Sequence, residues 1–233
     1  MNASRTARER VREELTREIT EIARSQLATE GAAGLSLRAV AREMGMASSA
    51  IYRYFPSRDD LLTALIIDGY NAIGAAAEQA DAACRPGDYT GRWLAVCRAV
   101  RDWALAHPHE YALVYGSPVP GYQAPQQTIA PAVRAATVYG KIISDAHRAG
   151  ALDPPGICPA PPQSFGPDAA ALRASVMAEV PDTVAARAVA GWTALFGMVS
   201  FELFGQFENV ITDRDAFFDH SMRCQGRLTG LST

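Results

Sequence analysis

Apolar residues recur at intervals of three to five positions through the long segments of this chain, and no segment convincingly alternates apolar with polar residues. A period near 3.6 residues is that of an amphipathic α-helix, whereas a half-buried strand requires strict alternation. The sequence therefore predicts an all-α protein. The clearest helical segments are residues 7–29, 91–107, 130–150, 181–207 and 214–228.

The N-terminal part predicts four helices, of which the second and third are short. The first covers residues 7–29 and is followed by two glycines. Ser36 is a suitable N-cap for the second helix, and Gly45 supplies a flexible residue at its end. A third helix spans about residues 48–55, and Pro56 separates it from a fourth, longer helix. These helices suggest a separate domain over residues 1–62, followed by a larger helical domain over residues 63–233.

Two irregular segments, residues 115–126 and 150–168, interrupt the later helices, and the second contains six prolines. Prolines at this density exclude a regular helix through the segment. The segment reads either as a solvated linker or as a lid over a ligand site.

The net charge and the cysteine positions disfavour several classes of protein. The net charge of −3 argues against indiscriminate polyanion binding, although residues 1–62 carry +1 and the remainder −4. The four cysteines are scattered without a C-x-x-C pair, which indicates buried reduced thiols rather than a disulfide framework or a zinc site. No long uncharged apolar run occurs, and the N-terminus alternates charges where a signal peptide needs an apolar core. A soluble cytoplasmic protein without a cofactor is expected.

The second and third helices have the spacing of a helix-turn-helix, whose second short helix enters the DNA major groove. Small residues at its start, Ser48, Ser49 and Ala50, would allow close approach to base edges. Tyrosines and arginines that follow would contact phosphates, whereas Ile51 and Phe55 would face the core. A helical hairpin with an ordinary polar surface is the alternative. The expected DNA-binding residues are Ser36, Arg38, Ser48, Ser49, Ala50, Tyr52, Arg53, Tyr54 and Arg58.

Over about residues 10–66 the chain strongly resembles the TetR family of bacterial transcriptional repressors. The matching positions are Ser36, Val40-Ala41, Gly45, Tyr52-Arg53-Tyr54-Phe55, Arg58 and Leu61-Leu62. The chain departs from the family at Ser48, Ser49 and Arg58, where Lys, Gly and Lys respectively are frequent; these departures bear on the operator sequence and not on the fold. The resemblance implies that Ser36 and Arg58 hold phosphates and that Tyr52 lies in or beside the groove.

The C-terminal part is similar to a TetR subgroup with a Trp-His-Gly signature, in which Phe196 here replaces the His. The resemblance implies an all-helical domain that dimerises through its last two long helices and encloses an effector pocket. We expect a ligand-responsive repressor that binds a palindromic operator as a homodimer.

Two further hypotheses belong to other classes. An enzyme is disfavoured because the chain lacks the common nucleophile, nucleotide and metalloprotease motifs. His107 and His109 flank a proline, which favours a helix end or loop over a metal site. A helical protein-interaction module, or a DNA binder without an effector, is the remaining alternative. Steep salt dependence of DNA affinity would distinguish a DNA binder from a protein-only module.

Aromatic residues supply most of the wall of a typical ligand cavity, so those of the second domain are the expected effector contacts. Ordinary core packing is the alternative for each. Because the chain has only one lysine, Lys141, and no evident charged cluster in this part, a small apolar or aromatic effector is expected. The expected effector-binding residues are Trp93, Trp103, Tyr111, Tyr115, Trp192, Phe196 and Phe201.

The segment 184–204 also carries an apolar stripe and small residues that permit close helix approach, so this segment and the final helix are predicted to form the dimer interface. The stripe comprises Val184, Val189, Leu195, Val199 and Leu203.

Overall fold

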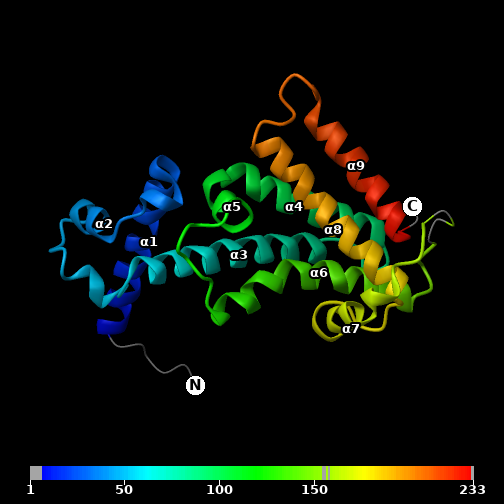
Figure 1. Ribbon diagram of the computed structural model, residues 1–233, viewed down its shortest axis with the longest axis horizontal. Coiled ribbons are helices and arrows are strands. Elements are labelled where there is room, and N and C mark those ends of the chain that lie inside the picture. The colour runs from blue at the N-terminus through cyan, green and yellow to red at the C-terminus, as the bar shows by residue number, and fades with distance from the viewer. Residues whose placement is uncertain (1–6, 154–155, 157, 232–233) are drawn as a thin grey trace. The chain divides into compact units, whose positions relative to one another are not determined.

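The computed structural model describes residues 7–153, 156 and 158–231. Within them the chain is helical, with no strand beyond a single bridge between Leu152 and Leu231 (Figure 1). The prediction of an all-α fold is confirmed. The helices are α1 (Ala7–Gly34), α2 (Leu37–Glu43), η1 (Ile51–Arg53), α3 (Arg58–Ala82), α4 (Tyr89–Ala106), α5 (Pro108–Tyr115), η2 (Gln126–Thr128), α6 (Ile129–Arg148), η3 (Gln163–Phe165), α7 (Gly166–Ser175), α8 (Asp182–Leu203) and α9 (Arg214–Thr229).

The chain forms two compact units. The first unit contains the described residues up to Gly69 together with Pro108–Thr128, and the second contains Tyr70–His107 and the described residues from Ile129 onward. Helix α3 passes from one unit into the other. This division differs from the expected boundary after residue 62 because α5 and the loop after it pack with the N-terminal helices. A functional boundary at residue 62 stays a prediction.

Local sequence explains the helix ends of the first unit. Gly31 adopts φ 69° and ψ 176° and breaks α1 before its last turn, a conformation that favours glycine. The Ser36 hydroxyl accepts from the Ala39 N–H and caps α2, and Gly45 follows with φ 67°. The Ser57 hydroxyl accepts from the Asp60 N–H at 3.1 Å at the start of α3. These caps are those that the sequence indicates.

The third helix differs from the expectation. Residues 48–50 form a turn and Ile51–Arg53 a single turn of 3₁₀-helix, because successive bonds join Ala50 N to Ala47 O and Arg53 N to Ala50 O. Pro56 limits the element, since the residue before a proline is disfavoured in the helical region. This segment, residues 48–55, is called the recognition element below and is therefore tighter and shorter than a regular α-helix.

The core of the first unit is made by both of its chain segments. Ile19, Val40, Ile51 and Leu61 are completely buried, and Leu113, Val119 and Tyr122 of the second segment pack against the same cluster. Hydroxyls of Thr63 and Tyr122 lie 2.9 Å apart. The loop that the sequence predicts over residues 115–126 is thus irregular but packed.

In the second unit α8 and α9 form an antiparallel hairpin, seen in orange and red in Figure 1. The Trp93 indole of α4 is fully buried and donates to the Met222 carbonyl of α9 at 2.8 Å. Gly226 permits this approach, because a Cβ there would lie 2.9 Å from Trp93 Cδ1. Likewise, a Cβ at Gly140 of α6 would lie 2.0 Å from the Val176 carbonyl oxygen beyond α7.

The cysteine prediction holds only in part. All four thiols are free, but only Cys97 is buried, while Cys224 on α9 is exposed. His107 ends α4, as expected for the His-Pro-His segment, and Pro108 begins α5. The apolar periodicity of the sequence did not predict α5 and α7, because each helix is short. Helix α7 also begins among the prolines and glycines of the irregular segment.

Candidate nucleic-acid interface and effector region

The recognition element exposes polar side chains on an apolar base. Ser48, Ser49, Tyr52 and Arg53 are exposed, whereas Ile51 is completely buried. Phe55 is also buried, so both predicted inward-facing residues lie in the core. Alternate burial of this kind fixes the orientation of η1 and leaves its polar side chains free to meet a partner.

The other expected DNA contacts lie on α2 and at the end of the recognition element. Ser36 is half-buried and its hydroxyl lies 3.4 Å from the Ala39 nitrogen that it caps. Arg38 is exposed in the first turn of α2, while Ala50 and Tyr54 are half-buried. The structure thus places all these residues in the first unit, and their contact with DNA stays a prediction.

Arg58 has a structural role that the sequence did not indicate. Its Nη2 donates to the Ala32 carbonyl at 2.6 Å, and its Nε donates to the Leu35 carbonyl at 3.2 Å. These carbonyls lie at the end of α1, where backbone acceptors lack partners within the helix. Arg58 therefore joins the start of α3 to the end of α1, and a phosphate contact by the same side chain stays a prediction.

The first unit also has a basic groove that the sequence did not predict. It has a volume of about 440 Å³ and is lined by Ala7, Arg8, Val11, Arg12, Arg53 and Tyr54. Arg8 and Arg12 recur at the i,i+4 spacing of one helix face, but the acids interspersed among them made the segment resemble an ordinary solvated helix. Only the fold brings them beside Arg53.

Charged residues also hold α1 against α3 and α5 within the first unit. Arg24 donates to Asp68 at 2.8 Å and to Glu110 at 3.2 Å. Burial raises the pKa of Asp68 even though the Arg24 charge opposes the shift. The helical bundle that supports the recognition element therefore includes residues of α5.

Of the residues expected to bind an effector, three belong to a packed aromatic stack in the second unit. Ring centroids lie 4.6 Å apart for Trp93 and Tyr139, 5.7 Å for Tyr139 and Trp192, and 4.9 Å for Trp192 and Phe196. Burial raises the pKa of the Tyr139 hydroxyl, which lies 3.5 Å from the Thr229 hydroxyl. Such spacing is that of ordinary aromatic packing.

The remaining four residues lie elsewhere. Trp103 stacks on His107 at 5.2 Å, and Phe201 is 54% exposed. Tyr111 and Tyr115 pair at 5.2 Å within the first unit. The structure therefore does not gather all seven aromatic residues around one site.

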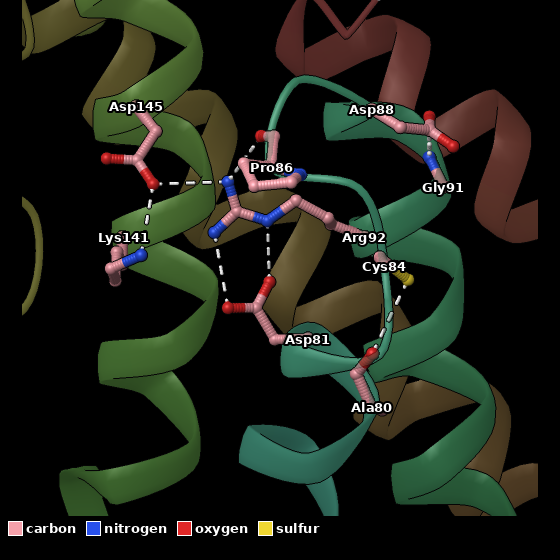
Figure 2. A network of polar contacts seen from close by, with 9 residues as sticks. All are labelled: Ala80, Asp81, Cys84, Pro86, Asp88, Gly91, Arg92, Lys141 and Asp145. Carbon is pink, nitrogen blue, oxygen red and sulfur yellow. Dashed lines mark hydrogen bonds and ion pairs between the residues drawn. The ribbon is translucent and has the colours of Figure 1, made fainter.

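A cavity of about 650 Å³ opens instead in the second unit. It lies beside a charged network, which Figure 2 shows. The Arg92 side chain, only 4% exposed, is the centre of this network. It donates to both carboxylate oxygens of Asp81, to the Pro86 carbonyl at 3.1 Å and to Asp145 at 3.1 Å. None of the seven aromatic residues lines this cavity.

The cavity is lined by the cations of Arg92, Lys141 and Arg148 and by the carboxylates of Asp81 and Asp145. Lys141 and Arg148 also pair with Asp145, and Arg148 lies 3.7 Å from Glu179. Although burial raises the pKa of Asp145, hydrogen bonds from Arg92 and Lys141 outweigh it, so the pKa falls below its ordinary value. A charged cluster therefore exists where none was evident in the sequence, but its cations already have carboxylate partners.

The apolar stripe expected for the dimer is partly wrong. Val184, Leu195 and Val199 are buried within the single chain, in a helix that packs against α4, α6, α7 and α9. Val189, Phe201 and Phe204 are the large apolar residues that this end of the chain exposes on or directly after α8. Gly197 faces open space.

The sequence matches two family descriptions that together cover most of the chain. Residues 19–65 match "Bacterial regulatory proteins, tetR family", and residues 93–224 match "Tetracyclin repressor-like, C-terminal domain". The HTH-type transcriptional regulators Rv1816 of Mycobacterium tuberculosis and Mb1846 of Mycobacterium bovis are each 37% identical to this chain, over 91% of both proteins in each case.

Solved structures are similar to this chain over most of its length. The crystal structure of regulatory protein SCO4313 has a TM-score of 0.75 at 34% identity, covering 94% of this chain and 98% of that one. A protein of unknown function from Rhodococcus sp. RHA1 has a TM-score of 0.67 at 25% identity, covering 90% and 94%. The similarity thus extends over both units.

Proposed function

Since the chain belongs to the TetR family and is a transcriptional regulator with a DNA-binding domain rather than an enzyme, we propose that it is a repressor. It binds a pseudo-palindromic operator as a homodimer and leaves the DNA when a small molecule binds. The observation that carries this proposal is the recognition element, which exposes Ser48, Ser49, Tyr52 and Arg53 above buried Ile51.

Base reading and positioning are divided among these residues. Ser48 and Ser49 reach base edges, because their short hydroxyl side chains allow close approach and can donate or accept. Arg38, Tyr52, Arg53 and Tyr54 contact phosphates and fix the register without reading sequence. Ser36 contributes while it caps α2.

Selection of binding sites from a random duplex library tests the operator proposal. Two recognition elements related by a dyad should enrich pseudo-palindromes whose half-sites lie about one helical turn or slightly more apart. Enrichment of asymmetric sites alone would contradict dimeric binding, and the absence of any enrichment would contradict specific DNA recognition.

The homodimer forms through the exposed face of α8 and through α9. By length and composition α8 could cross a membrane, and only 33% of its most apolar 18-residue stretch is buried within the chain. A second copy of the chain covers the remaining apolar surface in this proposal, which keeps the protein cytoplasmic. Gly197 permits close approach of the partner helix.

The effector is a small apolar or aromatic molecule that binds the second unit beside Trp192 and Phe196, which are both half-buried. The ion pairs around Arg92 support this choice, because the cavity lining has only one more cation than carboxylates and each cation already has a carboxylate partner. A tenfold preference for the DNA-free form corresponds to about 1.4 kcal/mol of coupling.

Thermal-shift screening with neutral aromatic compounds, followed by DNA binding, tests the effector proposal. A compound that raises the melting temperature should lower operator affinity, and Trp192→Ala should abolish both effects. If no apolar compound shifts the melting temperature, the protein is a constitutive DNA binder and only this part of the proposal fails.

A further inference from the structure

The basic groove at the start of α1 is lined by three arginines and by no acidic residue. Arg8 and Arg12 come from the first turns of α1, and Arg53 comes from η1. All three side chains are exposed, so their charges face solvent. Tyr54, which is half-buried, and the apolar Val11 complete the lining.

The spacing of the arginines is unfavourable for an isolated helix. Arg8 and Arg12 stand at i and i+4, where two like charges repel and slightly destabilise the helix. Arg53 adds a third positive charge from a segment 41 residues away from Arg12. An anion held among the three would relieve this repulsion.

Arg12 is already held in position. Its Nη2 donates to the Arg53 carbonyl at 3.2 Å, and its guanidinium carbon lies 5.9 Å from the centroid of the Tyr54 ring. The bond occupies one of the five N–H donors of the guanidinium and leaves others for a ligand. The same contact ties the start of α1 to the element that carries Tyr52 and Arg53.

We propose that this groove binds a phosphate of the DNA backbone beside the bases that the recognition element reads. Arg8 and Arg12 hold the phosphate together with Arg53, and Arg12 transmits the position of the strand to η1 through the Arg53 carbonyl. The proposal rests on DNA binding as proposed above, and it identifies contacts outside the helix-turn-helix. It also supplies phosphate contacts that do not depend on Arg58, whose guanidinium bonds the end of α1.

The test compares Arg8→Gln, Arg12→Gln and the double variant with wild type. Arg17→Gln is the matched control, because Arg17 is an exposed arginine of the same helix outside the groove. Fluorescence anisotropy measures binding to a random-sequence duplex and to a selected operator at about 50 to 300 mM KCl. Melting temperatures check that each variant is folded.

Each single groove variant should lower the slope of log affinity against log salt by about 0.9 per half-site, which is about 1.8 for the dimer, equally on both duplexes, since a phosphate contact carries no base information. Arg17→Gln should leave the slope unchanged. Arg8→Gln is the deciding variant, because no bond to the Arg53 carbonyl is lost in it. Replacing a single backbone phosphate by a neutral methylphosphonate should remove the difference between Arg8→Gln and wild type at one position in each half-site.

If the salt slopes of Arg8→Gln and Arg12→Gln equalled that of Arg17→Gln, phosphate binding in the groove would be refuted. DNA binding by the recognition element would remain intact. Loss of affinity for the operator alone would also overturn it, because Arg12 would then only position η1. If inorganic phosphate weakened binding far more than chloride at equal ionic strength, the groove would be a site for a free anion instead. A wild-type protein without affinity for either duplex would refute both this inference and the proposed function.

Discussion

Arg58 has to be judged by two different measurements, because the contacts it makes within the chain and the contact proposed with DNA would be lost together. Its guanidinium satisfies backbone carbonyls at the end of α1, and the side chain is 32% exposed. Hydrogen bonds from a charged donor contribute more than neutral ones. The side chain therefore contributes to folding whether or not DNA is present.

We expect Arg58→Ala to lower the free energy of unfolding by about 1–2 kcal/mol, because the α1 carbonyls lose their partner. Urea unfolding of the whole chain measures the loss. Arg42→Ala on the exposed face of α2 is the control and should change stability by less than about 0.5 kcal/mol. Equal stability of the two variants would leave Arg58 as a phosphate contact only.

Ser49→Ala tests the base-reading role at the same scale. The Ser49 side chain is exposed and lies within the turn of residues 48–50, so its removal should leave stability unchanged. The preferred bases at one or two positions of each half-site should change, with affinity for random DNA retained. Parallel selections with wild type and variant give the answer, and identical sequence preferences would exclude Ser49 from base reading.

At the scale of elements, close packing of α6 is the feature most sensitive to a single methyl group. A Cβ at Gly140 would meet the Val176 carbonyl oxygen at 2.0 Å, and backbone atoms there cannot move aside cheaply. We expect Gly140→Ala to cost about 1–3 kcal/mol of stability. Gly87→Ala is the control, since nothing lies within 4 Å of its added methyl group. A stability loss that was the same in both variants would show that α6 can shift away.

The Asp145 carboxylate, which joins α6 to α4, predicts a pH dependence. Its pKa in the folded protein lies below the ordinary value of 3.8. The stability it contributes is therefore present above that value and is lost as the pH falls through the folded-state pKa. Wild type should exceed Asp145→Asn in free energy of unfolding near neutral pH, and the difference should shrink below about pH 4. A difference independent of pH would contradict the ion pair.

Periodicity and capping residues predicted most elements, because Ser36, Gly45 and Pro56 act through neighbouring atoms. The sequence could not predict what distant segments do to one another. Pairing of Arg12 with the Arg53 carbonyl, and burial of Val199 against its own chain, depend on tertiary packing. The helix-turn-helix residues could therefore be predicted from local pattern, whereas the basic groove and the surface of α8 could not.

At the scale of the whole molecule, the exposed face of α8 should govern assembly. Val189→Glu and Phe201→Glu place a charge on that face and should weaken dimerisation at least about tenfold, equivalent to about 1.4 kcal/mol. Val210→Glu is the matched control, because Val210 is 70% exposed but lies beyond α8. Sedimentation equilibrium gives the dimer constants. If both α8 variants stayed as dimeric as the control, the interface would lie elsewhere.

The packing of α5 and residues 116–128 into the first unit limits how this chain could exchange parts with its relatives. Recombination that joined residues 1–69 to a foreign C-terminal domain would leave behind Leu113, Val119 and Tyr122, which complete the core around Leu61 and Thr63. A hybrid gene would have to carry two separate stretches of coding sequence to keep that core intact. New DNA specificities should therefore arise in this lineage more readily by point substitution at positions such as Ser49 than by shuffling of whole domains.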